Sequence, residues 1–93
     1  MTLLHVMTEA GWAELQRVGS QPPAPFWHLC TPAQLPLVLS RHFAGRRGLV
    51  VLHLDPATLT DLRWETSEPG EDPYPHLYAP LLAASVVSVT PTA

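Results

Sequence analysis

The sequence contains no lysine and only one cysteine, Cys30. A single cysteine cannot form a disulfide within the chain, and it is compatible with a reducing compartment. Five arginines against eight acidic residues give a net charge of -3, so the chain lacks a basic field that would attract phosphate backbones. These scarcities argue against a disulfide-stabilised secreted domain and against nucleic acid as a partner.

Familiar functional motifs and long apolar segments are missing as well. The sequence has no phosphate-binding loop, no CxxC pair and no nucleophile elbow. Its main apolar runs, residues 49–54 and 81–89, are shorter than the ~20 residues of a membrane-spanning helix. No basic segment followed by an apolar one stands at the N-terminus. We therefore expect a cytoplasmic protein without a membrane partner.

The remaining composition favours one small globular domain over residues 1–93. Hydrophobic residues make up 46% of the chain and charged residues 14%, which favours a folded chain over a disordered one. A domain of this size buries only about two thirds of the surface that its unfolded chain exposes. Eleven prolines predict short elements joined by rigid turns.

The first third of the chain predicts a strand, a helix and a second strand. Residues 3–7 form an apolar run of strand length. Thr8 can cap a following helix, and Gly19 can end it in a left-handed conformation. The apolar positions of this helix are Trp12, Leu15 and Val18. Residues 20–25 hold three prolines and predict an extended loop, which leads to a strand at residues 26–30.

A capping box gives the strongest local signal. Thr31 and Gln34 have the spacing at which each side chain bonds the other's backbone N–H, and Pro32 stands at the first helical position. The pattern predicts that a helix begins here. Pro36 removes a further backbone donor and is expected to distort the first turns.

The second half predicts mainly strands. Residues 49–54 are typical of a strand in the middle of a sheet, covered on both faces. Asp55 and the proline after it predict a short helical turn. Shorter strands are expected at residues 63–65 and 86–90, and a solvated loop at residues 66–75. Because strands and helices do not alternate regularly, the order favours an α+β domain with mostly antiparallel sheets and two helices.

Three histidines in apolar or aromatic segments are the main candidates for a functional site: His5, His28 and His76. Side chains alternate along a strand, so His28 is expected to share a face with Phe26 and Cys30. A single buried histidine usually bonds a backbone carbonyl and has no further role. Three such rings together favour a common cleft.

The other chemistry that these residues allow has less support. Three imidazoles and a water would match a catalytic zinc site, but their spacing fits no ligand motif, so no metal site is predicted. Cys30 stands two residues from His28, yet no acid is in place to orient the histidine, which favours a small buried thiol over a nucleophile. His42 and His53 are interpreted as structural.

Glu65 is the only acid expected on a strand of the packed domain. Arg63 lies two residues away on the same strand face, where the two side chains would form a surface ion pair worth under ~1 kcal/mol. The acids Glu68, Glu71 and Asp72 fall in the loop and are poor candidates for a preorganised site.

Five segments, taken in order, resemble the DUF952 family of small bacterial and plant proteins of unknown function. They are Leu-His-Val at residues 4–6, Phe-Trp-His-Leu-Cys-Thr at 26–31, Leu-Val-Val-Leu-His-Leu-Asp-Pro at 49–56, Arg-Trp-Glu at 63–65 and Pro-His-Leu-Tyr-Ala-Pro-Leu at 75–81. The resemblance spans nearly the whole chain. It implies a single DUF952-like domain.

The DUF952 family is in turn similar to the ADP-ribosyltransferase superfamily, whose fold is two small sheets around a nicotinamide cleft. The resemblance implies NAD as the candidate cofactor, with His5 at the position that holds its ribose or phosphate and His28 near the nicotinamide. Glu65 or His76 would take the third position, where an anion stabilises the charge that develops as nicotinamide leaves. The implied catalytic residues are His5, His28 and Glu65, and the implied cofactor contacts are His5, His28 and His76.

Two functional hypotheses remain. The first is an enzyme of ADP-ribosyltransferase-like fold that binds NAD, ADP-ribose or a related nucleotide in a histidine-lined cleft. The second is a non-catalytic module of the same fold that binds a small molecule or a protein through its aromatic side chains. The candidates for such contacts are Trp27, Trp64, Tyr74 and Tyr78.

Overall fold

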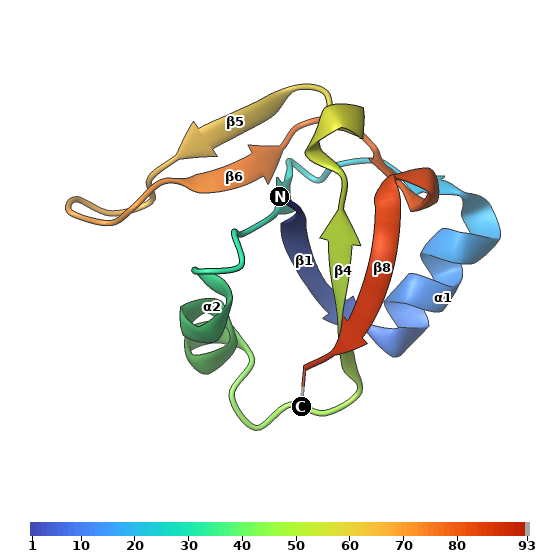
Figure 1. Ribbon diagram of the computed structural model, residues 1–93, viewed down its shortest axis with the longest axis horizontal. Coiled ribbons are helices and arrows are strands. Elements are labelled where there is room, and N and C mark those ends of the chain that lie inside the picture. The colour runs from blue at the N-terminus through green and yellow to red at the C-terminus, as the bar shows by residue number, and fades with distance from the viewer. Residues whose placement is uncertain (93) are drawn as a thin grey trace.

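Two three-stranded sheets and a two-stranded ribbon, all antiparallel, form the framework of the protein (Figure 1). The computed structural model describes residues 1–92. Its elements are β1 (Leu3–Thr8), α1 (Glu9–Val18), β2 (Ser20–Gln21), β3 (Trp27–His28), α2 (Leu35–His42), β4 (Leu49–Leu54), β5 (Leu62–Glu65), β6 (Tyr74–Leu77), β7 (Leu81–Leu82) and β8 (Val86–Pro91). The predicted α+β class with mostly antiparallel sheets and two helices is confirmed over these residues.

The central sheet has the strand order β1-β4-β8, so β4 lies in the middle as the sequence predicted. Side chains alternate along β4, and the two sets enter different cores. Leu52 and Leu54 face the core that also receives Leu15 of α1. Leu49 and Val51 face the core that α2 covers. Both faces of the central strand are therefore buried.

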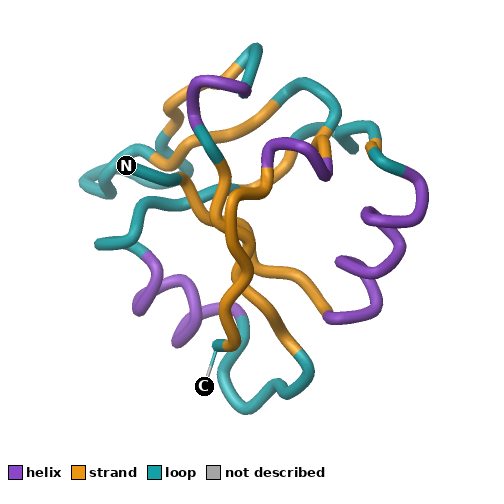
Figure 2. Tube along the Cα trace, turned by 45° about the vertical axis from the view of Figure 1, so that its right-hand side comes forward, coloured by secondary structure: helices purple, strands orange, loops and turns teal. Residues whose placement is uncertain are grey.

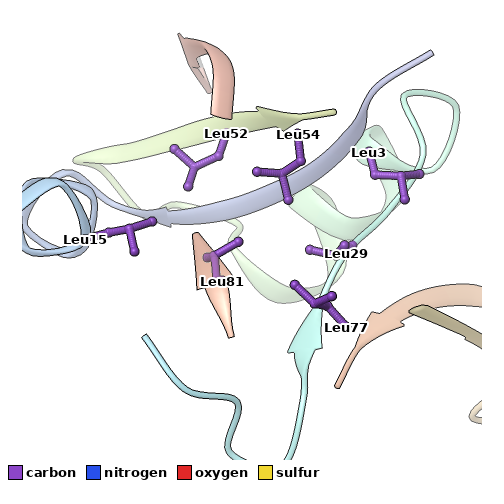
Figure 3. Packing of buried hydrophobic residues seen from close by; sticks show 7 residues of the cluster. All are labelled: Leu3, Leu15, Leu29, Leu52, Leu54, Leu77 and Leu81. Atoms are coloured by element: carbon purple, nitrogen blue, oxygen red, sulfur yellow. The ribbon is translucent and has the colours of Figure 1, made fainter. Parts of the chain in front are cut away.

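Seven leucines form the larger core, which we refer to as the leucine core. Figure 3 shows their side chains converging from α1, β1, β4, β6, β7 and the segment after β3. They are Leu3, Leu15, Leu29, Leu52, Leu54, Leu77 and Leu81, and none is more than 3% exposed. Burial of apolar surface is the dominant favourable term in folding, so this core makes a large contribution to stability.

Helix α1 forms as its capping residues predict. The side-chain oxygen of Thr8 accepts a hydrogen bond from the backbone N–H of Gly11 at 2.9 Å. Gly19 ends the helix at φ 86°, a left-handed conformation that glycine adopts without steric cost. Leu15 is fully buried in the leucine core, whereas Val18 stays exposed at the end of the helix.

Helix α2 begins later than predicted. The capping box forms, because the Gln34 amide donates to the Thr31 hydroxyl at 3.2 Å and the Thr31 amide donates to the Gln34 side chain at 3.0 Å. Residues 32–34 nevertheless form a turn, and the α-helix starts at Leu35. Pro36 has no N–H with which to bond the carbonyl four residues earlier, so the helical ladder cannot include Pro32.

Three other segments differ from their prediction. Ser20–Gln21 pairs with β7 and forms a short strand in the region predicted as loop. The strand predicted at residues 26–30 keeps only Trp27–His28, because Cys30 leaves it to bridge Leu4 of the central sheet. The loop before His76 ends early, so that this histidine lies inside β6.

The third sheet, β3-β6-β5, lies beyond one end of the central sheet, with the β5–β6 hairpin reaching away from it (Figure 1). After this hairpin the chain passes through β7 and a short 3₁₀ helix (Ala83–Ser85) into β8, which pairs with β4 among the strands drawn in orange in Figure 2. The resemblance implied two small sheets, whereas residues 1–92 add the β2-β7 ribbon as a third. No helix in this part of the chain is long and apolar enough to cross a membrane.

Candidate functional site

A row of three side chains crosses the outer face of the β3-β6-β5 sheet. The strand register places His76 opposite Arg63 on one side and opposite His28 on the other. Paired positions of neighbouring strands share a face, so the three side chains lie next to one another. Trp27 and Leu77, the partners one residue away, point to the other face and pack in the leucine core. The sheet that carries the polar row therefore packs against the leucine core through Trp27 and Leu77 on its other face.

Phe26 lies at the centre of this face. Its ring stacks on His76 with a centroid distance of 4.1 Å and an interplanar angle of 26°. It also contacts His28 at 4.6 Å and Tyr78 at 5.1 Å. The rings of His28 and His76 meet in a T-shaped arrangement with a centroid distance of 5.4 Å. Together with Glu65 these residues form what we term the outer cluster.

Glu65 connects two members of the outer cluster through one oxygen. Its Oε1 accepts a hydrogen bond from the Tyr78 hydroxyl at 2.6 Å and lies 2.9 Å from Nδ1 of His76. The bond from Tyr78 and then the bond from His76 lower the pKa of Glu65, and the carboxylate in turn raises the pKa of Tyr78. Glu65 is therefore ionised near neutral pH, with its side chain 41% exposed.

Arg63 borders the outer cluster and pairs with a different acid from the one predicted. Its guanidinium bonds Asp61 at 3.0 Å and lies over the Tyr78 ring, 4.0 Å from the ring centre. The predicted ion pair with Glu65 is wrong, because Asp61 and the Tyr78 ring hold the guanidinium. Asp61 adopts φ 49°, a conformation that aspartate tolerates better than most residues.

His5 reaches the same region from behind. Its Nδ1 lies 2.7 Å from the backbone carbonyl of His28 and donates to it, while its ring meets Trp27 edge-on at 5.3 Å. Trp27 is on the opposite face of β3 from His28, and none of the ring contacts of the outer cluster includes His5. Burial lowers the pKa of His5. His5 therefore braces the backbone of β3, and the expected common cleft of three imidazoles does not form.

His28 is the exposed imidazole of the outer cluster. Partial burial lowers its pKa, and the nearby imidazoles of His76 and His42 lower it further. Its ring nitrogens have no hydrogen-bond partner among residues 1–92, so the neutral ring can offer both nitrogens to a ligand. The sequence-predicted residues His28, Glu65 and His76 are brought together, and His5 is held one layer below.

The other candidates lie apart from this face. Cys30 is buried in the core under α2, where burial raises its pKa to about 11. It does not share a face with His28 as predicted, because the chain leaves β3 directly after that residue. His53 bonds the Thr90 hydroxyl at 2.8 Å across the central sheet. Neither residue contacts the outer cluster.

Two cavities lie away from the outer cluster as well. One of about 440 Å³ separates α2 from the loop before β6, and its polar lining includes Gln34, Arg41, Glu68, Glu71 and Asp72. The other, of about 330 Å³, lies between α2 and the end of the described chain, lined by Leu39, Phe43 and Leu49 among others. No group of three histidine, cysteine, aspartate or glutamate side chains within residues 1–92 is placed to hold a metal ion. The outer cluster is an aromatic face with a fixed carboxylate.

Two members of the outer cluster were not among the predicted site residues. Tyr78 was considered only as an aromatic contact, although it stands two residues after His76 and so shares its face. Phe26 was placed on the face of His28 by the same alternation, but its central position depends on the pairing of β3 with β6. That pairing is set by the fold and has no local sequence signal.

Comparison with known proteins gives a family. The sequence matches DUF952, described as a protein of unknown function, over residues 6–89, which begins just after His5. Two crystal structures of protein CC0527 from Caulobacter crescentus, one of a double methionine mutant, match with a TM-score of 0.86 at 26% identity, covering 98% of this chain and 85% of that one. The solution structure of CC0527 matches with a TM-score of 0.81 at 28% identity, covering 97% and 83%. No curated protein matches the sequence. The chain belongs to the DUF952 family.

Proposed function

We propose that the outer cluster binds NAD or a related nucleotide containing ADP-ribose, and that the protein is an ADP-ribosyltransferase-like enzyme. The observation that carries this proposal is the Glu65 carboxylate, fixed by Tyr78 and His76 beside a layer of stacked rings. Its second oxygen, Oε2, has no hydrogen-bond partner among residues 1–92. A charged, oriented acceptor next to an aromatic face suits a ligand that carries both hydroxyl groups and a planar cationic ring.

The chemistry of NAD fits the parts of this face. The rings of Phe26 and His28 offer surfaces on which a nicotinamide or adenine ring stacks. The free oxygen of Glu65 accepts a ribose hydroxyl and stabilises the positive charge that develops on the ribose as nicotinamide leaves. Arg63 places a half-exposed guanidinium at the border, where a diphosphate would find a partner.

The two remaining histidines take different parts in this proposal. His28 contacts the ligand directly with its exposed ring. His5 acts from behind, because its bond to the His28 carbonyl fixes the strand that carries both His28 and the preceding Phe26. The resemblance implied a direct ligand contact for His5, and the proposal replaces that contact with a supporting role.

A titration of isotope-labelled protein with NAD and with ADP-ribose tests the proposal. We expect saturable NMR shifts at the imidazole of His28, the side chain of Tyr78 and the amides of β3 and β6. Glu65→Gln is expected to weaken these shifts while keeping the fold, and Glu68→Gln in the exposed loop serves as the matched control. Absence of shifts in the wild-type protein at millimolar ligand would refute nucleotide binding at this face.

The alternative is a non-catalytic binding module with the same fold. Its support is Trp64, which is 48% exposed on the side of β5 opposite Arg63 and Glu65. A large exposed aromatic side chain is a common anchor in protein interfaces. Release of nicotinamide from NAD, followed by one-dimensional NMR over a day, separates the two functions: binding without release favours the module.

A further inference from the structure

The hydrogen bond between Glu65 and His76 fixes which nitrogen of the imidazole carries a proton. An ionised carboxylate can only accept, so Nδ1 of His76 must donate across the 2.9 Å contact. In a neutral ring the other nitrogen, Nε2, then carries the lone pair. The arrangement therefore defines the ring tautomer as well as the ring position.

Nε2 of His76 is left without a hydrogen-bond partner among residues 1–92 and keeps a limited contact with solvent. Within those residues the only fully buried side-chain nitrogen or oxygen without a partner is Nε1 of Trp27, so Nε2 of His76 keeps some contact with solvent even though the side chain is 8% exposed. The stacked ring of Phe26 covers one face of the imidazole and limits its rotation.

Tyr78 fixes the carboxylate that fixes His76. Its hydroxyl and Nδ1 of His76 bond the same oxygen of Glu65, which restricts rotation of the carboxylate. Two ring contacts hold Tyr78 in turn, one with Phe26 and one with the guanidinium of Arg63. Groups held in this way need little reorganisation when charge changes next to them.

We propose that Nε2 of His76 is the proton acceptor of the outer cluster, and that Glu65 and Tyr78 are its positioning residues. Which molecule gives the proton to His76 rests on the proposed function, in which it is the water or hydroxyl group that attacks the ribose. The attacking oxygen, which belongs to water or to a hydroxyl group, forms a bond to C1′ of the ribose. At the same time the bond from C1′ to nicotinamide breaks, and its electron pair stays on the nicotinamide nitrogen. The attacking oxygen gives its proton to Nε2 of His76. Glu65 stabilises the resulting imidazolium before the proton leaves to solvent.

The charged and titratable groups around His76 are consistent with this role. Glu65 and Arg63 face it from β5, His28 faces it from β3, and Tyr78 lies beside it after β6. Arg63 is bound to Asp61, so the charge in direct contact with the imidazole is the carboxylate of Glu65. The carboxylate therefore lies on the Nδ1 side of the imidazole, opposite the nitrogen that is free to accept a proton.

The first test needs no nucleotide. Nitrogen-15 NMR of the imidazoles reports the tautomer, and diethyl pyrocarbonate, which modifies unprotonated imidazole nitrogens, reports the reactivity of each histidine by peptide mass spectrometry. We expect the Nδ1–H tautomer for His76 and faster modification at Nε2 than for His53, whose Nε2 is hydrogen-bonded. Glu65→Ala should abolish the preference for this tautomer and slow the modification several-fold, with Glu68→Ala as the control.

The second test measures function. His76→Gly should reduce nicotinamide release from NAD about 100-fold, the usual size of a general-base contribution, and added imidazole should restore part of it. A purely structural histidine would not give this rescue. Tyr78→Phe, which keeps the ring contacts, should lower the rate less and shift its pH profile.

The two tests separate the two proposals. If wild-type protein releases no nicotinamide but His76 shows the expected tautomer and reactivity, the proposed function fails and the proton acceptor stands. An Nε2–H tautomer, or modification that Glu65→Ala leaves unchanged, overturns the assignment of His76. Nicotinamide release that persists in His76→Gly without imidazole overturns it as well. Circular dichroism confirms that each variant is folded.

Discussion

The two faces of the β3-β6-β5 sheet are built on different principles. The inner face joins the leucine core, in which seven leucine side chains pack against one another. Such apolar packing is not directional. The outer face depends on bonds to a single oxygen of Glu65 and on the stacking of Phe26. Leu77 and His76 are neighbours in β6, yet each belongs to a different face. Burial thus supplies stability on one side, and that stability allows polar groups to be held in place on the other.

Removing a leucine from the leucine core, which the inner face joins, should have the largest effect on stability. Leu52 is fully buried in the central strand, so Leu52→Ala loses both the transfer free energy of the side chain and the contacts around the resulting cavity. We expect the free energy of unfolding to fall by about 2–5 kcal/mol. Urea denaturation followed by fluorescence measures this change.

The matched control is another leucine with little burial. Leu37 of α2 is 44% exposed, and Leu37→Ala should change the free energy of unfolding by no more than about 0.5 kcal/mol. A similar loss in both variants would mean that the leucine core is not the main source of stability.

Substitutions of His5 and His28 should also differ in how much stability they cost, by less than those of Leu52 and Leu37. His5→Ala leaves the carbonyl of His28 without its 2.7 Å donor and removes the contact with Trp27, which should cost about 1–3 kcal/mol. The exposed ring of His28 makes no such bond, so His28→Ala should change stability little. Thermal unfolding of both variants, combined with the NAD titration, compares the two roles. Equal stability losses would contradict the division between a supporting and a contacting histidine.

Local signals in the sequence were sufficient for much of the fold. The apolar run at residues 49–54 forms the central strand. Thr8 begins α1 and Gly19 ends it, as these residue types predict. The start of α2 was wrong because the capping box formed ahead of the helix, and the two prolines decided where the ladder could begin. Strand β3 was predicted too long because the pairing of Cys30 with Leu4 is a long-range contact.

The candidate site was predictable in its residue types and not in its arrangement. His28, His76 and Glu65 were each recognised from their local context, but the pairing of β3 with β6, which brings His28 to the other two, joins distant segments of the chain. The supporting role of His5 could not be predicted either, because its hydrogen-bond partner is a backbone carbonyl, which every residue has. Tyr78 had a local signal, its distance of two residues from His76, which gains meaning only once β6 is known to be a strand.

Acid should weaken the two faces in different pH ranges. Burial lowers the pKa of His5 below its usual 6.5, so the unfolded chain takes up a proton first and stability falls as the pH drops below that value. Glu65 has its pKa lowered below 4.5 by Tyr78 and His76, so its contribution is present above that pH and is lost as the pH falls through the folded value. Both groups thus make the protein less stable in acid, His5 as the pH falls below 6.5 and Glu65 as it falls below 4.5.

Variants assign each range to its residue. Tyr78→Phe should reduce the loss of stability below pH 4.5, because the Glu65 carboxylate then has one donor fewer, and should leave the range near pH 6 unchanged. His5→Asn should reduce the loss near pH 6 to the part that the lowered pKa of His28 contributes, and should leave the range below pH 4.5 unchanged. Urea denaturation at closely spaced pH values gives both results. A wild-type stability that does not change between pH 7 and 5 would show that His5 is not buried in its neutral form.

The smallest effect is expected where an exposed charge meets the outer cluster. Arg63→Gln removes the contact with the Tyr78 ring and the ion pair with Asp61, both half-exposed, and should cost at most about 1 kcal/mol. Arg17 forms a similar ion pair with Glu14 on α1 but contacts no ring, so Arg17→Gln is the control. The difference between the two variants in urea denaturation measures what the Tyr78 contact adds. If Arg63→Gln also alters the tyrosine signals that report the bond to Glu65, then Arg63 helps to fix the outer cluster; unchanged signals would confine its role to the border.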